Sequence, residues 1–184
     1  MKSYKHCITE SEARAKLTVK KKLFRSPKNP VKIELVHIPF YFFRLRARDV
    51  KGKVREFCAA MDAVVGSFAL VDLDRMEQIE IAANEFKPRL PKKDLQDTLM
   101  SEAKWFLKHK ARRGRGRYEL LSADQGELAW YPFWVGYYQN KDGSIGFLAL
   151  DAISGVYQSG SARRIFIHAF SKIRSTVNGE RFKL

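Results

Sequence analysis

The two halves of this chain carry the same features in the same order, and this recurrence constrains the fold more than any other property. Each half has a proline among aromatic residues, then a glycine-containing turn, then the segment Asp-Ala-x-x-Gly. These features lie at 38–42, 51–53 and 61–66 in the first half, and at 131–135, 141–143 and 150–155 in the second. Pro39 and Asp62 are 23 residues apart and Pro132 and Asp151 are 19 apart, so the hairpins differ by about one turn. The shared order favours an internal duplication over chance similarity between two hairpins.

A helix is expected before each hairpin. In the first half, Thr9 and Glu12 have the spacing of a capping box, and the helix would run to about Phe24. In the second half, Pro91 suits the first position of a helix that ends near Gly114. An apolar stripe at helical spacing supports this second helix, and its members are Leu95, Leu99, Ala103, Phe106 and Leu107.

Another strand is expected after each Asp-Ala-x-x-Gly corner, over Met76 to Ala83 in the first half and Arg164 to Phe170 in the second. The sequence therefore predicts an α+β fold, a tandem duplication of a helix followed by a three- to four-stranded antiparallel sheet. The first repeat covers 1–86 and the second covers 87–184. One helix on each sheet would cover its apolar face. Packing the repeats side by side, either as two sheets or as one continuous sheet, would remove an exposed edge from each.

The segment Ile8-Thr9-Glu10-Ser11-Glu12-Ala13, followed by a helix, a hairpin and the corner at 151–155, resembles the PepSY domain pattern. The corner at 62–66 is a looser match, so the resemblance covers two copies over most of the chain. It implies cystatin-like α+β units and a role in binding or regulating peptidases. PepSY domains are usually exported or membrane-associated, and the proline and aromatic residues at which these strands begin depart from the usual pattern.

The sequence shows neither a catalytic motif nor a set of residues at metal-ligand spacing. Nothing in the sequence brings Asp62 and Asp151 within the roughly 5 to 10 Å that paired catalytic carboxylates need, and an Asx-turn is the simpler role for each. The four histidines lack metal-ligand spacing. No Walker A loop, dinucleotide fingerprint or Gly-x-Ser-x-Gly elbow is present. The sequence therefore predicts a protein that is not an enzyme and that has no cofactor and no metal.

Positive charge is the main indication of function. The chain has 35 Lys and Arg against 20 Asp and Glu, a net charge of +15, which favours nucleic acid, an acidic protein or an anionic membrane as partner. Arg14 to Lys32 contains eight basic residues and no acid, and Lys104 to Arg117 contains seven and no acid. Three further arginines alternate with apolar residues over 43–48, so they are expected to share one face of the first hairpin.

The leading hypothesis is a non-catalytic basic binding protein or accessory subunit that contacts nucleic acid or a nucleoprotein complex. The candidate nucleic-acid-binding residues are Lys20, Lys21, Lys22, Arg25, Arg44, Arg46, Arg48, Lys108, Lys110, Arg112, Arg113, Arg115 and Arg117. The alternative is a protein–protein interaction module of PepSY type, acting as a peptidase regulator. Solvated helix faces would also explain the basic clusters. Attachment to an anionic membrane is less favoured, because no clean amphipathic helix with a broad apolar face is present.

Residues 1–7 lack the apolar core of a signal peptide. No stretch approaches the roughly 18 to 20 consecutive apolar residues of a membrane span. Two cysteines, Cys7 and Cys58, cannot form a disulfide framework. Together these features indicate a reducing, cytoplasmic setting.

Overall fold

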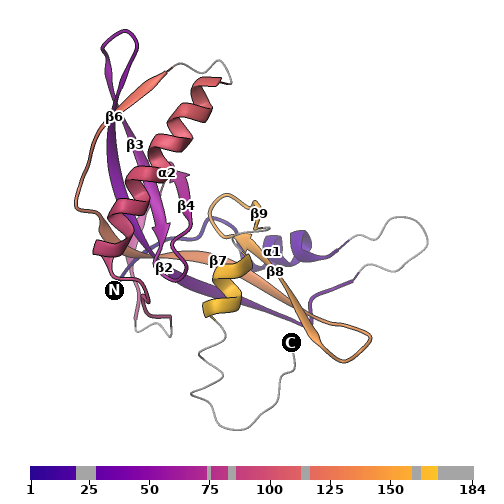
Figure 1. Cartoon of the computed structure of the whole chain (residues 1–184). Coiled ribbons are helices and arrows are strands. Elements are labelled where there is room, and N and C mark those ends of the chain that lie inside the picture. The colour runs from indigo at the N-terminus through magenta and orange to yellow at the C-terminus, as the bar shows by residue number, and fades with distance from the viewer. Residues whose placement is uncertain (20–27, 74–75, 83–85, 113–116, 159–162, 170–184) are drawn as a thin grey trace.

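The computed structural model of the chain describes residues 1–19, 28–73, 76–82, 86–112, 117–158 and 163–169. In these residues nine strands form one sheet around two long central strands, β2 (Lys32–Asp49) and β7 (Glu127–Gln139) (Figure 1). The other strands are β1 (Lys2–Tyr4), β3 (Val54–Asp62), β4 (Phe68–Val71), β5 (Gln78–Glu80), β6 (Tyr118–Ala123), β8 (Ile145–Asp151) and β9 (Tyr157–Gln158). The main order is β4-β3-β2-β7-β1-β5; in addition β6 pairs with β2, β8 with β7, and β9 with β8.

The prediction of a tandem duplication of a helix followed by a three- to four-stranded antiparallel sheet is wrong. β2 from the first half and β7 from the second pair directly, from Lys32 opposite Tyr137 to Phe42 opposite Glu127, so both halves contribute to one sheet. The sheet is also mixed, because β1 runs parallel to β7. Strands of the two halves also interleave: β1 of the first half pairs with β7, and β6 of the second half pairs with β2, so the strands do not divide into two small repeats. This pairing satisfies backbone groups that would stay exposed at the edges of two separate sheets.

Two helices cover the face of the sheet on which the odd-numbered residues of β2 lie. The longer helix, α2 (Lys92–Arg112), packs on the C-terminal half of β2 and buries Phe43 and Leu45. The shorter helix, α1 (Glu10–Leu17), packs at the other end of the strand, in a cluster with Leu35 and Trp134. Among the residues that the structure describes, no helix is both long enough and apolar enough to cross a membrane.

The opposite face holds the largest apolar cluster, which includes Ile38, Phe40 and Phe133. A short helix over residues 163–169 packs against this cluster and buries Ile165 and Phe166 (Figure 1). The strand predicted over Arg164 to Phe170 is therefore wrong for the part that is described. Its buried side chains recur at helical spacing and not on alternate residues.

The capping box of α1 is confirmed, because the Glu12 backbone N–H donates to the Thr9 hydroxyl and the Glu12 carboxylate accepts from the Thr9 backbone N–H at 2.8 Å. The hydrogen bonds from Thr9 lower the pKa of Glu12. The helix ends at Leu17 and not at Phe24: Thr18 is extended, and the backbone of the next residue pairs with Lys28. Residues 20–27 lie outside the described part.

Both Asp-Ala-x-x-Gly corners are Asx-turns, as predicted. Asp62 is completely buried, and its carboxylate accepts hydrogen bonds from the backbone N–H groups of Val64, Val65 and Ser67 at 3.0, 2.6 and 2.6 Å. Asp151 accepts from two backbone N–H groups at 2.8 and 2.9 Å and from the Tyr131 hydroxyl at 2.9 Å. Both carboxylates therefore hold the chain at the ends of β3 and β8.

The segment between β6 and β7 lets one continuous run of chain follow β2 along almost its whole length. The Asp124 carboxylate accepts from the backbone N–H groups of Arg44 and Gly126, each at 3.0 Å. Gly126 has a positive φ of 68°, and its α-carbon lies against the ring of Phe43. β6, which precedes this turn in the chain, pairs with the last residues of β2. The position of β6 therefore depends on the close contact between Gly126 and the Phe43 ring.

Candidate nucleic-acid interface

The end of β2 displays arginine on one face and buries apolar side chains on the other. Leu45 and Ala47 are buried on the α2 side, whereas Arg44, Arg46 and Arg48 are exposed on the opposite side. The alternation follows from the strand geometry, because successive side chains point to opposite faces. The prediction that these arginines share a face is confirmed.

Segments far apart in the sequence meet at this end of the molecule. The register pairs Arg48 with Glu119 and Asp49 with Tyr118, so the start of β6 lies beside the end of β2. Across the sheet, the ring of Phe57 on β3 contacts Tyr118 edge-on, with centroids 5.4 Å apart. α2 packs over the same strands, and its C-terminal part lies at the same end of the molecule as the tip of the β2–β3 hairpin (Figure 1). We call residues 44–56, 101–112 and 117–124 the basic end.

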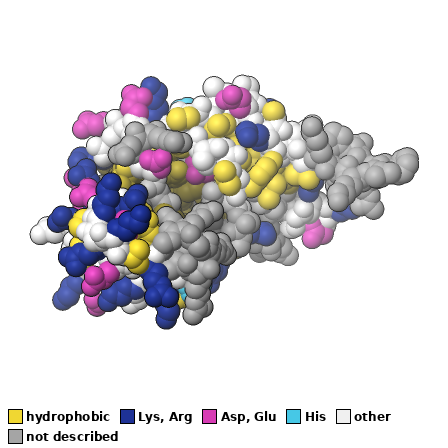
Figure 2. All heavy atoms as spheres, turned by 90° about the horizontal axis from the view of Figure 1, so that it is seen from above, with side chains coloured by type: hydrophobic (Ala, Val, Ile, Leu, Met, Phe, Trp, Pro, Cys, Tyr) yellow, Lys and Arg dark blue, Asp and Glu magenta, His cyan; other side chains and the backbone are white. Residues whose placement is uncertain are grey.

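The positive charge of the described residues is concentrated in the basic end. Its three segments contain eleven Lys and Arg against five Asp and Glu. The other described residues contain thirteen Lys and Arg against twelve Asp and Glu, so they are almost neutral. Figure 2 looks down on this end, at the left of the picture, and shows Lys and Arg side chains gathered over it. The basic end therefore carries most of the net charge of the described part.

Acidic neighbours engage some of these cations and leave others available. Arg46 lies 3.8 Å from Glu56, Arg48 lies 3.6 Å from Glu119, and Arg55 lies 3.5 Å from Asp49. Such exposed pairs contribute little stability, about 0 to 1 kcal/mol each, so an anionic ligand can displace them. Within the described residues no ion pair engages six further exposed cations of the basic end, which are Arg44, Lys51, Lys53, Lys104, Lys108 and Arg117.

The Asp49 carboxylate organises the hairpin tip. Desolvation acts to raise its pKa, but hydrogen bonds from the backbone N–H groups of Lys53 and Lys51 and the nearby Arg55 outweigh that effect and lower it. The two N–H groups donate to one carboxylate oxygen at 3.0 and 2.9 Å. Asp49 therefore stays ionised at neutral pH and fixes the turn that carries the two lysines.

The remaining predicted site residues are placed as follows. Lys108 is exposed on α2, and Lys110 and Arg112 lie in the last turns of that helix, while Arg117 is exposed just before β6. Six of the predicted residues lie outside the described part: Lys20, Lys21, Lys22, Arg25, Arg113 and Arg115.

The described residues of the two predicted basic clusters lie at opposite ends of β2. Lys32, in the first cluster, begins β2. Arg117, in the second, directly precedes Tyr118, which pairs with Asp49 at the end of β2. The two ends are separated by roughly 50 Å of extended strand.

Sequence reasoning missed Trp105 and His109 on the solvent side of α2. The Trp105 side chain is 57% exposed, and its ring stacks on the His109 imidazole with centroids 3.9 Å apart and planes 29° apart. The helical spacing of the apolar residues in the sequence could have revealed the exposure of Trp105. Trp105 lies away from the buried stripe of Leu95, Leu99 and Ala103, where an aromatic side chain has no core to fill.

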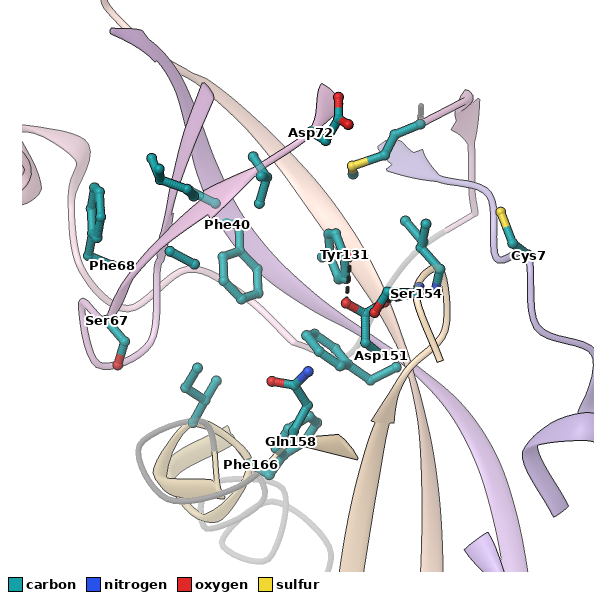
Figure 3. A pocket seen from close by; sticks show the side chains of 18 residues that line it. Cys7, Phe40, Ser67, Phe68, Asp72, Tyr131, Asp151, Ser154, Gln158 and Phe166 are labelled. Carbon is teal, nitrogen blue, oxygen red and sulfur yellow. Dashed lines mark hydrogen bonds between the residues drawn. The ribbon is translucent and has the colours of Figure 1, made fainter. Parts of the chain in front are cut away.

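A cavity of about 680 Å³ lies on the face of the sheet opposite α1 and α2, between β4 and the corner after β8 (Figure 3). That volume is within the usual range for ligand pockets. Its lining is mainly apolar and aromatic and includes Phe40, Phe133 and Phe166. The polar lining groups include Asp72 and Asp151, and none of the described lining residues is Lys or Arg. The cavity therefore suits a neutral or cationic apolar group and not an anion.

The polar centre of the cavity is a structural pair. The Tyr131 hydroxyl donates to Asp151, as the dashed line in Figure 3 shows. Burial and the neighbouring carboxylate raise the pKa of Tyr131. Asp151 is also bonded to the backbone of its own turn, so the pair ties the corner to β7. In the described part, no group of three or more His, Cys, Asp and Glu side chains could hold a metal ion.

Comparisons with protein-family models, with curated proteins and with solved structures gave no match to this chain. The resemblance of its corners and first helix to the PepSY pattern therefore stays a prediction.

Proposed function

We propose that this chain is a non-catalytic protein that binds nucleic acid through its basic end. The observation that supports the proposal is the uneven distribution of charge: eleven basic against five acidic residues at the basic end, and thirteen against twelve elsewhere in the described part. An arrangement of this kind concentrates positive potential at one end of the molecule, on both faces of the sheet. Phosphate groups respond mainly to such a potential, and they release counterions when they bind.

The form of the surface indicates contacts with phosphates more than with base edges. The lysines at the hairpin tip and on α2 are exposed, and a lysine acts on phosphate as a flexible point charge. The expected binding is therefore weakly dependent on sequence and strongly dependent on salt.

The test is a titration of labelled oligonucleotides with the full-length chain at several salt concentrations, read by fluorescence anisotropy. The test variant carries Lys53→Glu and Lys108→Glu, two exposed cations from different segments of the basic end. The matched control carries Lys93→Glu and Lys141→Glu, which change the net charge equally but lie outside the basic end. We expect the test variant to bind at least about ten-fold more weakly and to lose roughly 1.5 to 2 from the slope of log K against log salt.

The control variant should bind only slightly more weakly than the unchanged chain, because long-range attraction is screened beyond about 10 Å at 0.1 M salt. Equal losses in the two variants would show that net charge and not the basic end determines binding. Absence of salt-dependent binding by the unchanged chain would refute the proposal altogether.

The cavity favours a second candidate function, recognition of an apolar protein segment. Its aromatic lining and its lack of described Lys or Arg suit a neutral or cationic peptide, which agrees with the protein-interaction role that the PepSY resemblance implies. Such a complex would persist at moderate salt, because burial of apolar surface is little affected by screening. A salt-resistant protein complex that forms equally well with the Lys53→Glu/Lys108→Glu variant would support this alternative.

A further inference from the structure

Trp105 is an exposed aromatic side chain on a helix whose apolar stripe is already satisfied. Trp130 and Trp134 are 8% and 7% exposed, and their indole N–H groups donate to the carbonyls of Phe86 and Ile8 at 2.9 and 2.7 Å. Trp105 is 57% exposed, so it does not share their core role. A large apolar side chain left in solvent is more informative than a buried one, because folding does not explain its presence.

The indole of Trp105 is held in place on one side. Its ring stacks on the imidazole of His109, one turn further along α2, at a centroid distance of 3.9 Å. The Nδ1 of that imidazole lies 2.9 Å from the Trp105 carbonyl oxygen, and an N–H at Nδ1 donates to it. This bond restrains the imidazole, whose plane lies within 29° of the indole plane. The pair therefore forms a pre-organised flat platform.

Positive charge flanks this platform. Lys104 and Lys108 are exposed on α2, one turn apart, about 6 Å along the helix axis. Lys108 is three residues after Trp105 and so lies on the same side of the helix, as does the exposed Glu102, three residues before it. Lys104 directly precedes Trp105. A flat aromatic surface with cations beside it is the combination that binds an unpaired base and its phosphates.

We propose that Trp105, supported by His109, stacks on an unpaired base, so that the basic end prefers single-stranded nucleic acid to duplex. The inference rests on the proposed function and specifies its ligand. In a duplex each base face is covered by its neighbours, so that only phosphates and groove edges meet a protein. In a single strand the faces are accessible, and stacking on an aromatic side chain does not depend on sequence.

The test uses the intrinsic fluorescence of the full-length chain, since the other two of its three tryptophans are buried. An oligothymidylate of about 16 nucleotides, which matches the upper site size of common single-strand binders, is compared with a duplex of equal length. We expect the single strand to quench the emission and the duplex to leave it unchanged. Trp105→Leu should lose the quenching and bind the single strand about ten-fold more weakly, with unchanged duplex affinity. Trp105→Phe should retain most of the affinity.

The outcomes separate this inference from the proposed function. If the single strand binds in a salt-dependent way without quenching, and Trp105→Leu binds both ligands like the unchanged chain, stacking is refuted while nucleic-acid binding stands. If neither ligand binds, both proposals fail. Quenching by vesicles that contain phosphatidylserine, without quenching by the oligothymidylate, would also refute stacking, because it would assign the indole to a membrane interface.

Discussion

Replacement of Gly126 by alanine tests how the turn between β6 and β7 holds these two strands against β2. A Cβ at position 126 would lie 2.4 Å from Cε1, 2.6 Å from Cδ1 and 3.0 Å from Cζ of Phe43. Phe43 is completely buried under α2, so its ring has little space into which it can move. The residue also has φ of 68°, a left-handed conformation that costs an alanine about 1 to 2 kcal/mol.

The two effects add to a large expected loss. Forced repacking of a filled core costs about 1 to 3 kcal/mol, so Gly126→Ala should lower the free energy of unfolding by about 2 to 5 kcal/mol. At this chain length that corresponds to a fall in Tm of roughly 10 °C. The assay is urea unfolding followed by near-UV circular dichroism, with Tm from calorimetry as a second measurement.

Gly143→Ala is the matched control. Gly143 has φ of 80°, but a Cβ there would meet nothing within 4 Å, so only the backbone cost of about 1 to 2 kcal/mol applies. A double-mutant cycle with Phe43→Leu should show a favourable coupling of about 0.5 to 3 kcal/mol with Gly126→Ala, because the smaller side chain relieves the contact. The reasoning is refuted if the two glycine variants are equally stable within about 0.5 kcal/mol and the cycle shows no coupling.

Three further predictions concern polar groups that are at least partly buried. Asp62→Asn should lower the free energy of unfolding by about 2 to 4 kcal/mol, because its amide NH2 would replace one carboxylate oxygen and face a backbone N–H that now donates to it, such as that of Ser67. Asp151→Asn should cost only about 1 kcal/mol, since the Tyr131 hydroxyl can reverse and accept; equal costs in urea unfolding would contradict this account. Burial, aided by nearby His6, lowers the pKa of His37 in the folded chain. Below about pH 6.5 the unfolded chain therefore binds more protons than the folded chain, and the free energy of unfolding decreases as the pH is lowered. His37→Gln should flatten this part of the stability profile, and an unchanged profile would show that other groups dominate.

Local features of the fold were predictable because they depend on neighbouring residues. The capping box at Thr9 and the two Asx-turns need only a side chain and the backbone N–H groups two to five residues further on. The apolar stripe of α2 is also confirmed, because the spacing of apolar residues within a single segment is enough to reveal it. The exposure of Arg44, Arg46 and Arg48 follows in the same way from strand alternation.

The arrangement of the sheet could not be predicted from such signals. Alternation shows which face a residue occupies but does not name the partner strand, and β2 pairs with β7 about ninety residues away in sequence. Similar hairpins in the two halves therefore suggested two self-contained repeats, whereas the strands of the two halves interleave in one sheet. The helix at 163–169 was predicted as a strand for a different reason. Ile165 and Ile167 alternate like a strand, but Phe166 is the residue buried beside Ile165, and short apolar runs do not separate the two periods.

The basic end is a consequence of strand register as much as of composition. A slip of one residue would turn Arg44 and its neighbours toward α2, because side chains alternate with a period of two. Burial of Phe43 beneath that helix opposes the slip, and so do the hydrogen bonds that Asp124 makes with the Arg44 backbone and with Gly126. Changes to the register should therefore reduce stability and nucleic-acid affinity together, whereas Lys53→Glu/Lys108→Glu should reduce affinity alone. If Gly126→Ala proved destabilising but bound oligonucleotides as the unchanged chain does at a temperature where both are folded, the display of charge would not depend on this turn.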